Sequence, residues 1–269
     1  MKRRFASSFL VAAVLFLADT LAGFQPAAAD QTAPAPPSSE PAASGPLTPD
    51  QRQEVERIIH DYLLKNPELM MEVLDAAEQQ HKEQEAQRSS QTIAAKRDEL
   101  LNDPAAPIGG NPKGDVTIVE FFDYQCPYCK QVEPVIEALV KSDPKVRIVY
   151  KEFPILGPES HVASHVAFAA LKQGPEQYIK VHNALLGAKG HLTDEAIMQI
   201  ADDAGLDMTK LKADMAAPEI ETALKKNYDL AVALGIEGTP AFIVGDALAP
   251  GALDADTLRA MIAEARKHG

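Results

Sequence analysis

The only two cysteines of this chain, Cys126 and Cys129, form a Cys-x-x-Cys motif at the end of a short apolar run. Apolar side chains then recur at three- and four-residue spacing, which predicts a helix that begins at Cys126. Pro127 suits the first helical position, where a missing N–H costs nothing. Two thiols at a helix N-terminus are suited to disulfide exchange, because the N–H groups and the dipole there stabilise a thiolate.

We expect different roles for the two thiols. Cys126 would be the exposed nucleophile, and Cys129, on the same helix face, the covered thiol that closes a disulfide with it. A stabilised thiolate makes that disulfide easier to reduce, so the pair tends toward an oxidant. No further cofactor is expected.

Two other interpretations of the cysteines are weaker. A structural zinc site needs four ligands, and no close Cys and His cluster accompanies the motif. An inert disulfide of this spacing would restrain almost no chain entropy. Redox catalysis is therefore the prediction.

Glu120 lies within an apolar run, Val116 to Phe122, that reads as the strand leading to the cysteines. Strand alternation could place its side chain on a solvent face. If it is buried under the cysteines instead, its pKa would be raised and it could accept protons during exchange. The pattern leaves both possibilities open.

Pro240, after Thr239, begins a later apolar strand, where a proline is unusual unless the strand is at an edge. A cis peptide there would form a turn that brings its backbone to another element, and an ordinary trans edge proline is the alternative. His161 and His165 could share a helix face as metal ligands. No third ligand is evident, so surface or capping roles are favoured.

The chain has 269 residues, enough for one large or two smaller domains, and 46% of them are hydrophobic, enough for a core. Its formal net charge of −13 argues against nucleic acid and against an anionic membrane surface as partners.

Residues 1–29 have the pattern of a cleaved signal peptide, with three basic residues, a short apolar segment and Ala27-Ala28-Ala29 as cleavage site. A membrane anchor is the alternative, but the apolar run is too short and Asp19 follows it. Export would place the cysteines in an oxidising compartment, where disulfide chemistry can proceed.

Residues 30–46 are rich in Pro, Ala and Ser and predict a disordered tether. Residues 47–77 predict two short amphipathic helices, the first with a capping box at Thr48 and the second beginning at Asn66-Pro67. Residues 78–106 predict a charged helix or flexible linker. The apolar stripes of the two helices are Val55, Ile58, Ile59, Tyr62 and Leu63, and Leu69, Met70, Val73, Leu74 and Ala77.

These stripes have two possible partners. They could fold back on the main domain, or stripes from two or three chains could bind one another. The polar spacer favours self-association because it separates the stripes from the catalytic region. The pattern does not choose between a dimer and a trimer.

Residues 107–269 predict an α/β domain. After the helix that follows Cys126 come a second strand at 146–153, parallel to the first, and a helical insert at about 158–235. The strand after Pro240, a hairpin through Gly245-Asp246 and a final helix at 254–267 complete it.

This order resembles the thioredoxin fold in its DsbA-like form, from about Pro107 to the C-terminus. The stretches that carry the resemblance are Gly110-Asn111-Pro112-Lys113-Gly114-Asp115-Val116 and Glu120-Phe121-Phe122-Asp123-Tyr124-Gln125-Cys126-Pro127-Tyr128-Cys129. It implies that Cys126 is the nucleophile, Cys129 the resolving cysteine, Pro240 a cis-proline facing them, Thr239 the residue before it and Glu120 a buried acid. Pro127 and Tyr128 form the active-site dipeptide.

The N-terminal part, from Leu47 to the polar spacer, is similar to the suppressor-of-copper-sensitivity protein C (ScsC) group, some of which are stalk-joined trimeric disulfide isomerases. This resemblance implies a homo-oligomer, with a trimer favoured over a dimer. The chain also resembles the isomerases DsbC and DsbG in having Thr, here Thr239, before the cis-proline. The DsbA oxidase has Val at that position. The Pro127-Tyr128 dipeptide is compatible with either role.

Together these resemblances imply a periplasmic disulfide isomerase for unfolded or misoxidised secreted proteins, served by a membrane redox partner. A DsbA-like oxidase that donates its disulfide is the alternative. A copper-binding or copper-tolerance protein is the third reading, because two thiolates suit Cu(I), but Met- and His-rich tracts are absent from the sequence.

Overall fold

The computed structural model describes residues 46–268, so the predicted signal peptide and all but the last residue of the predicted tether lie outside the described residues. Within the described residues, the chain divides into two units, with the boundary between Tyr62 and Leu63. Most of helix α1 (Pro49–Lys65) belongs to the first unit, and none of its residues is buried. Its predicted capping box is present: the Thr48 N–H donates to Gln51 Oε1 (3.0 Å), and the Gln51 N–H donates to Thr48 Oγ1 (3.3 Å).

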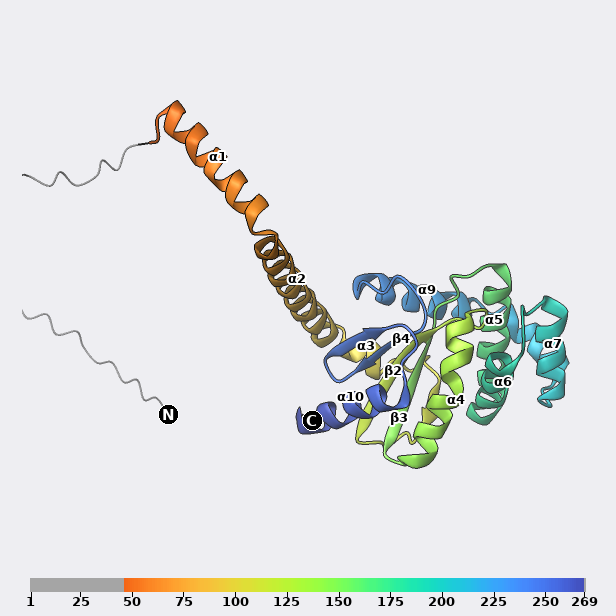
Figure 1. The fold of residues 1–269 in the computed structure, drawn as a ribbon. Helices are drawn as coiled ribbons and strands as arrows, with labels where there is room; N and C mark the ends of the chain where they lie inside the picture. The colour runs from red at the N-terminus through yellow and green to blue at the C-terminus, as the bar shows by residue number, and fades with distance from the viewer. Residues whose placement is uncertain (1–45, 269) are drawn as a thin grey trace, which may run out of the picture. The chain divides into compact units, whose positions relative to one another are not determined.

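The second unit is a five-stranded sheet with helices on both faces (Figure 1). Its helices are α2 (Pro67–Ala95), α3 (Arg97–Leu101), α4 (Pro127–Ser142), α5 (Pro158–Gln173), α6 (Pro175–Gly187), α7 (Asp194–Asp203), α8 (Met208–Met215), α9 (Pro218–Ala233) and α10 (Ala255–His268). Its strands are β1 (Ile108–Gly110), β2 (Val116–Phe122), β3 (Val146–Glu152), β4 (Ala241–Val244) and β5 (Ala247–Pro250). None of the helices within residues 46–268 has the length and apolar content that a membrane span requires.

The strand order is β1-β3-β2-β4-β5, so β2 is the central strand. It pairs in parallel with β3 and antiparallel with β4, and this register places Glu120 between Tyr150 and Phe242. Helices α5 to α9 form the predicted insert between β3 and β4, and α5, α6 and α7 gather at one side of the sheet (Figure 1). The predicted fold is thereby confirmed.

Strand β1 was not predicted, because the Pro and Gly residues within 103–114 are not typical of a strand. It pairs antiparallel with the edge of β3, where Gly109 lies opposite Ile148. A Cβ on Gly109 would lie 2.8 Å from the Tyr150 ring, and one on Gly110 would lie 2.5 Å from the carbonyl oxygen of Val146. The glycines that obscure the strand in the sequence are what allow this close approach.

The two sheet faces have separate cores. Cys129, Ile136 and Leu258 belong to the core on the face that α4 and α10 cover. Ile93, at the end of α2, and Leu100, on α3, are buried in the core of the opposite face. The charged stretch at 78–91 is helical throughout, within α2, and this helix ends in the core of the sheet domain.

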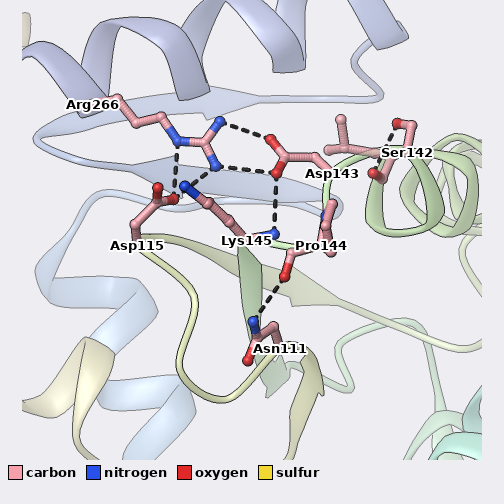
Figure 2. Close-up of polar contacts among 8 residues, drawn as sticks. Asn111, Asp115, Ser142, Asp143, Pro144, Lys145 and Arg266 are labelled. Atoms are coloured by element: carbon pink, nitrogen blue, oxygen red, sulfur yellow. Dashed lines mark hydrogen bonds and ion pairs between the residues drawn. The ribbon is translucent and has the colours of Figure 1, made fainter.

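A charged cluster fixes α10 at the end of β2 farthest from Cys126 (Figure 2). The Arg266 guanidinium donates to Asp115 Oδ1, before β2, at 2.7 Å and 2.9 Å, and to Asp143 Oδ2, after α4, at 2.7 Å. In the same region, Asn111 Nδ2 donates to the Pro144 carbonyl oxygen at 2.8 Å. These contacts join the last helix to the loops that flank β2 and α4.

Candidate active site

Cys126 stands at the N-cap of α4, in extended conformation with φ −70° and ψ 118°, and Pro127 is the first helical residue. Its N–H donates to the Asp123 carbonyl oxygen at 3.0 Å, and its own carbonyl accepts from the Lys130 N–H at 3.1 Å. This turn directs the cysteine toward the N-terminal end of the helix, as the sequence predicted.

The sequence predicted that Cys126 would be exposed, but its side chain is buried. Its relative exposure is 3%, and that of Cys129 is 0%. The loop before β4 provides part of the cover, because the Cys126 sulfur lies 3.2 Å from the Thr239 carbonyl oxygen. Tyr128, between the cysteines, is 61% exposed, so the dipeptide rather than the sulfur faces solvent.

The two thiols differ in acidity. A hydrogen bond from Cys129 lowers the pKa of Cys126 to about 5, against the effect of burial, and the Thr239 side chain and the N–H groups of Cys129 and Tyr128 act in the same direction. Burial raises the pKa of Cys129, and its hydrogen bond to Cys126 adds to this effect. At neutral pH the pair therefore holds one thiolate, on Cys126, and one proton, on Cys129.

The peptide bond between Thr239 and Pro240 is cis, as the resemblance implied. The Pro240 carbonyl oxygen accepts a hydrogen bond from the Gly251 N–H at 2.8 Å, which ties the loop to the end of β5. The loop presents the Thr239 carbonyl to the Cys126 sulfur across 113 residues of sequence.

Glu120 is fully buried, with 0% exposure, because β2 is central and both of its faces are covered. It shares a face with Ile118 and Phe122, on the side of α4. Neither carboxyl oxygen has a hydrogen-bond partner among the described residues. Burial raises the pKa of Glu120 well above its usual range, and the charge of Glu133 on α4 adds to the rise.

Sequence reasoning did not single out Asp123, although it lies inside the motif that carried the resemblance. Its buried carboxylate accepts hydrogen bonds from the Ser160 hydroxyl (2.7 Å) and from the N–H groups of Ile155 (2.8 Å) and Leu156 (3.0 Å). It therefore joins the turn before Cys126 to the loop after β3 and to the start of α5.

Tyr124 and His182 were also missed, because residues from separate elements make their cluster. The Tyr124 hydroxyl lies 3.2 Å from His182 Nδ1 on α6 and 3.4 Å from Glu152 Oε1 on β3. His182 Nε2 lies 3.8 Å from Glu133 Oε2 on α4. Burial raises the pKa of Glu152 to about 8, although hydroxyl groups around it act in the opposite direction. This buried polar cluster connects the helical insert to the active-site turn.

Of the two histidines considered as metal ligands, His165 has other contacts. His165 Nδ1 lies 2.9 Å from the Met215 carbonyl oxygen at the end of α8, and its Nε2 lies 3.1 Å from Glu221 Oε1. His161 is exposed. Over residues 46–268, no group of three or more His, Cys, Asp or Glu side chains has an arrangement that could hold a metal ion.

A cysteine pair at a helix N-terminus, faced by a cis-proline loop of the same sheet, defines the fold and site of a thiol-disulfide exchange protein. The helical insert between β3 and β4 narrows the class further. The chain belongs to the DsbA-like thioredoxin domain family, whose model matches residues 117–263. The model of the copper resistance protein ScsC N-terminal domain matches residues 51–84.

Curated relatives share this domain in different contexts. The chain is 28% identical over 160 residues to the Na(+)/H(+) antiporter NhaA 1 of Salinispora arenicola, a match that covers 59% of this chain and 24% of the antiporter. The chain thus spans about a quarter of that relative. It is 31% identical over 143 residues to the thiol:disulfide interchange protein DsbA of Bordetella parapertussis, covering 52% of this chain and 68% of that protein.

Solved structures are similar over more of the chain. A thioredoxin-like oxidoreductase from Silicibacter pomeroyi is 46% identical, with a TM-score of 0.62, over 64% of this chain and 98% of that one. Proteus mirabilis ScsC in a transitional conformation is 31% identical, also with a TM-score of 0.62, over 83% of this chain and 98% of that one. The second match extends beyond the catalytic domain.

Proposed function

We propose that this chain is an exported protein thiol-disulfide oxidoreductase that acts as a disulfide isomerase. The observation that carries the proposal is the Cys126 sulfur, which lies at the N-terminus of α4 beside Thr239 with a pKa lowered to about 5. A thiolate at neutral pH is the species that attacks disulfides.

In the proposed reaction, the Cys126 thiolate attacks one sulfur of a non-native client disulfide, and the other client sulfur leaves as a thiolate. That thiolate then attacks a different disulfide of the client and, after rearrangement, Cys126 is released. Alternatively, Cys129 loses its proton and attacks Cys126, which releases the reduced client and leaves an oxidised pair. The first route is net isomerisation, and the second requires a reductant to restore the dithiol.

Glu120 is proposed to accept the proton of Cys129 during the second route. Glu120 is buried, and its charge raises the pKa of Cys129, which indicates that the two groups interact electrostatically. A neutral carboxyl cannot accept that proton, so the raised pKa of Glu120 limits this step at low pH.

Self-association through α1 and the start of α2 is part of the proposal. Ile58 and Ile59 on α1 are 53% and 52% exposed, and Val73 and Leu74 on α2 are 55% and 56% exposed. Apolar stripes of this kind favour a partner, and a second or third copy of the chain supplies the same stripe. Because α2 is one helix, about 28 Å of it separates Leu74 from Ile93 in the sheet core.

The match of residues 51–84 to the ScsC N-terminal domain supports a homo-oligomer, and a trimer is proposed over a dimer. Several exchange sites around one cavity would raise the local concentration of reactive thiols about an unfolded client. The signal-peptide pattern and the DsbA-like relatives support a periplasmic location. Misoxidised secreted proteins are the proposed clients, with a membrane reductant as partner.

Refolding of a scrambled-disulfide test protein, compared with oxidation of a reduced one, tests this function. The mature chain is compared with the double variant Ile58→Asp/Ile59→Asp, and with His60→Asp as a control on the same helix. Loss of isomerisation together with loss of self-association in the double variant alone is the expected result. A monomeric double variant that still isomerises would contradict the proposed role of the stalk.

The alternative is a DsbA-like oxidase, and similarity to the Bordetella DsbA supports it. An oxidase would have its cysteine pair oxidised in cells and reoxidised by a membrane partner, whereas an isomerase would have it reduced. Alkylation of free thiols in intact cells measures which form is present and so separates the two functions. A copper-tolerance role is a further candidate, because of the description of the ScsC N-terminal domain model. Titration of the reduced protein with Cu(I), with Cys126→Ser as control, tests it.

A further inference from the structure

The loop between α6 and α7, residues 188–193, is attached to both sides of the cysteine pair. Gln125, which precedes Cys126, uses its whole carboxamide: Nε2 donates to the Leu192 carbonyl oxygen at 2.7 Å, and Oε1 accepts from the Leu192 N–H at 3.0 Å. Lys130, which follows Cys129, donates from Nζ to the Gly190 carbonyl oxygen at 2.8 Å.

These contacts hold the loop at two points. Leu192 is 2% exposed, so its side chain is anchored in the core, and both of its backbone polar groups bond to Gln125. Gly190, with φ 77°, occupies a conformation that favours glycine. Without these hydrogen bonds, loop 188–193, which has no regular secondary structure, would move away from the domain at a low cost in free energy.

His191 lies between the two attachment points. Its side chain is 63% exposed, and Nε2 lies 3.8 Å from Glu159 Oε1 on α5. The next residue on α5, Ser160, donates to the Asp123 carboxylate in the active-site turn. The neighbours of His191, Gly190 and Leu192, are therefore bonded to residues that flank the cysteines, while most of the imidazole is open to solvent.

We infer that loop 188–193 is a client-contact element, that His191 contacts the polypeptide beside the reacting client cysteine, and that Gln125 and Lys130 are positioning residues for this loop. The inference rests on the proposed function, since it concerns how a protein client is recognised. An ordered loop requires less entropy loss on binding than a mobile one, so the two attachments would improve client affinity.

A specificity test separates this role from the chemistry of the thiols. A disulfide-bonded peptide carries chain on both sides of its cysteines and can contact the loop, whereas oxidised glutathione is too small to offer a comparable chain. The measured quantities are kcat and KM for the peptide, the second-order rate with oxidised glutathione, and the pH profile of Cys126 alkylation.

The chain contains a matched control for Gln125. Gln173 forms the same two-bond arrangement with another loop of the insert: its Nε2 donates to the Asp207 carbonyl oxygen at 3.0 Å, and its Oε1 accepts from the Asp207 N–H at 2.9 Å. Gln173→Ala therefore removes an equivalent pair of hydrogen bonds that involves neither the active-site turn nor loop 188–193.

We expect Gln125→Ala to raise KM for the peptide about tenfold, since it removes two hydrogen bonds, and His191→Ala to raise it about threefold. The peptide-to-glutathione rate ratio falls in both variants and stays at the wild-type value in Gln173→Ala. His191→Ala changes an exposed residue, so it serves as the second variant if Gln125→Ala does not fold.

Two results would overturn the inference: an equal change in Gln125→Ala and Gln173→Ala, or a peptide-to-glutathione ratio that is unchanged in His191→Ala. A wild-type chain that reacts with glutathione disulfide but with no peptide or protein disulfide gives a different result. It would refute the proposed function itself, and the client-contact role with it.

Discussion

The Cys126 sulfur lies 3.2 Å from the carbonyl oxygen of Thr239. This contact brings the start of α4 against the cis-proline loop that precedes β4. It covers the sulfur of Cys126, and the Thr239 side chain contributes to the low pKa of that thiol. One loop therefore determines both the access to the nucleophile and part of its acidity.

Alkylation of Cys126 should follow an apparent pKa of about 5, so its rate is nearly constant from pH 6 to 8 and falls below pH 5. Cys129→Ala removes the largest cause of the low pKa, and the midpoint of the profile should move to higher pH. Iodoacetamide alkylation followed by mass spectrometry measures this. A midpoint that stays near 5 in Cys129→Ala would refute Cys129 as the main cause of the low pKa.

The same shift affects stability. The pKa of Cys126 in the folded, reduced protein lies below the usual value of about 8.5, so this group favours folding fully above that pH. Its contribution decreases as pH falls and is lost below about 5.

Glu120→Leu should raise the free energy of unfolding by about 1–3 kcal/mol near pH 8, because a buried carboxyl group without a partner is costly. Release of the mixed disulfide by Cys129 should slow in the same variant, because the proposed proton acceptor is absent. Urea unfolding and stopped-flow kinetics measure the two effects. Glu120→Gln keeps an unpaired polar group at the same position. It should show the slower release without a comparable gain in stability. A Glu120→Leu variant that is less stable than the wild-type chain would argue against this account.

Glu152 should make the protein less stable as pH rises. In the unfolded chain this carboxyl loses its proton near the usual pKa of about 4.3, whereas the folded protein retains it until about pH 8. Stability attributable to Glu152 is therefore present below pH 4.3 and decreases up to about pH 8. Glu152→Gln should flatten the pH dependence of the unfolding midpoint, and Glu176→Gln, at an exposed position, is the control.

Ile93→Ala should destabilise the catalytic domain by about 2–5 kcal/mol, because Ile93 is 1% exposed and its truncation leaves a cavity against the sheet. Val73→Ala, at a 55% exposed position on the same helix, should change the stability of the sheet domain little. Denaturant unfolding of the full chain, carrying one substitution at a time, measures both contributions. Equal effects of the two substitutions would mean that the end of α2 is not part of the domain core.

Glu120 illustrates what a local sequence pattern leaves undetermined. The run from Val116 to Phe122 identified the strand, but alternation could not say whether its polar residue faced water or the core. That depends on the position of the strand in the sheet, and β2 is central with helices on both faces. Strand order is a long-range property, since residues far apart in the chain determine it.

The sequence by itself determined the Cys126 and Cys129 pair, the helix that begins there, the helical insert and the strand after Pro240, because each has a local pattern of spacing or composition. Only the tertiary structure decided the burial of Cys126, the contacts of Gln125 with Leu192, and the cluster around Tyr124 and His182. Each of these depends on side chains that meet across tens of residues, and a periodic pattern within one element contains no information about its partner.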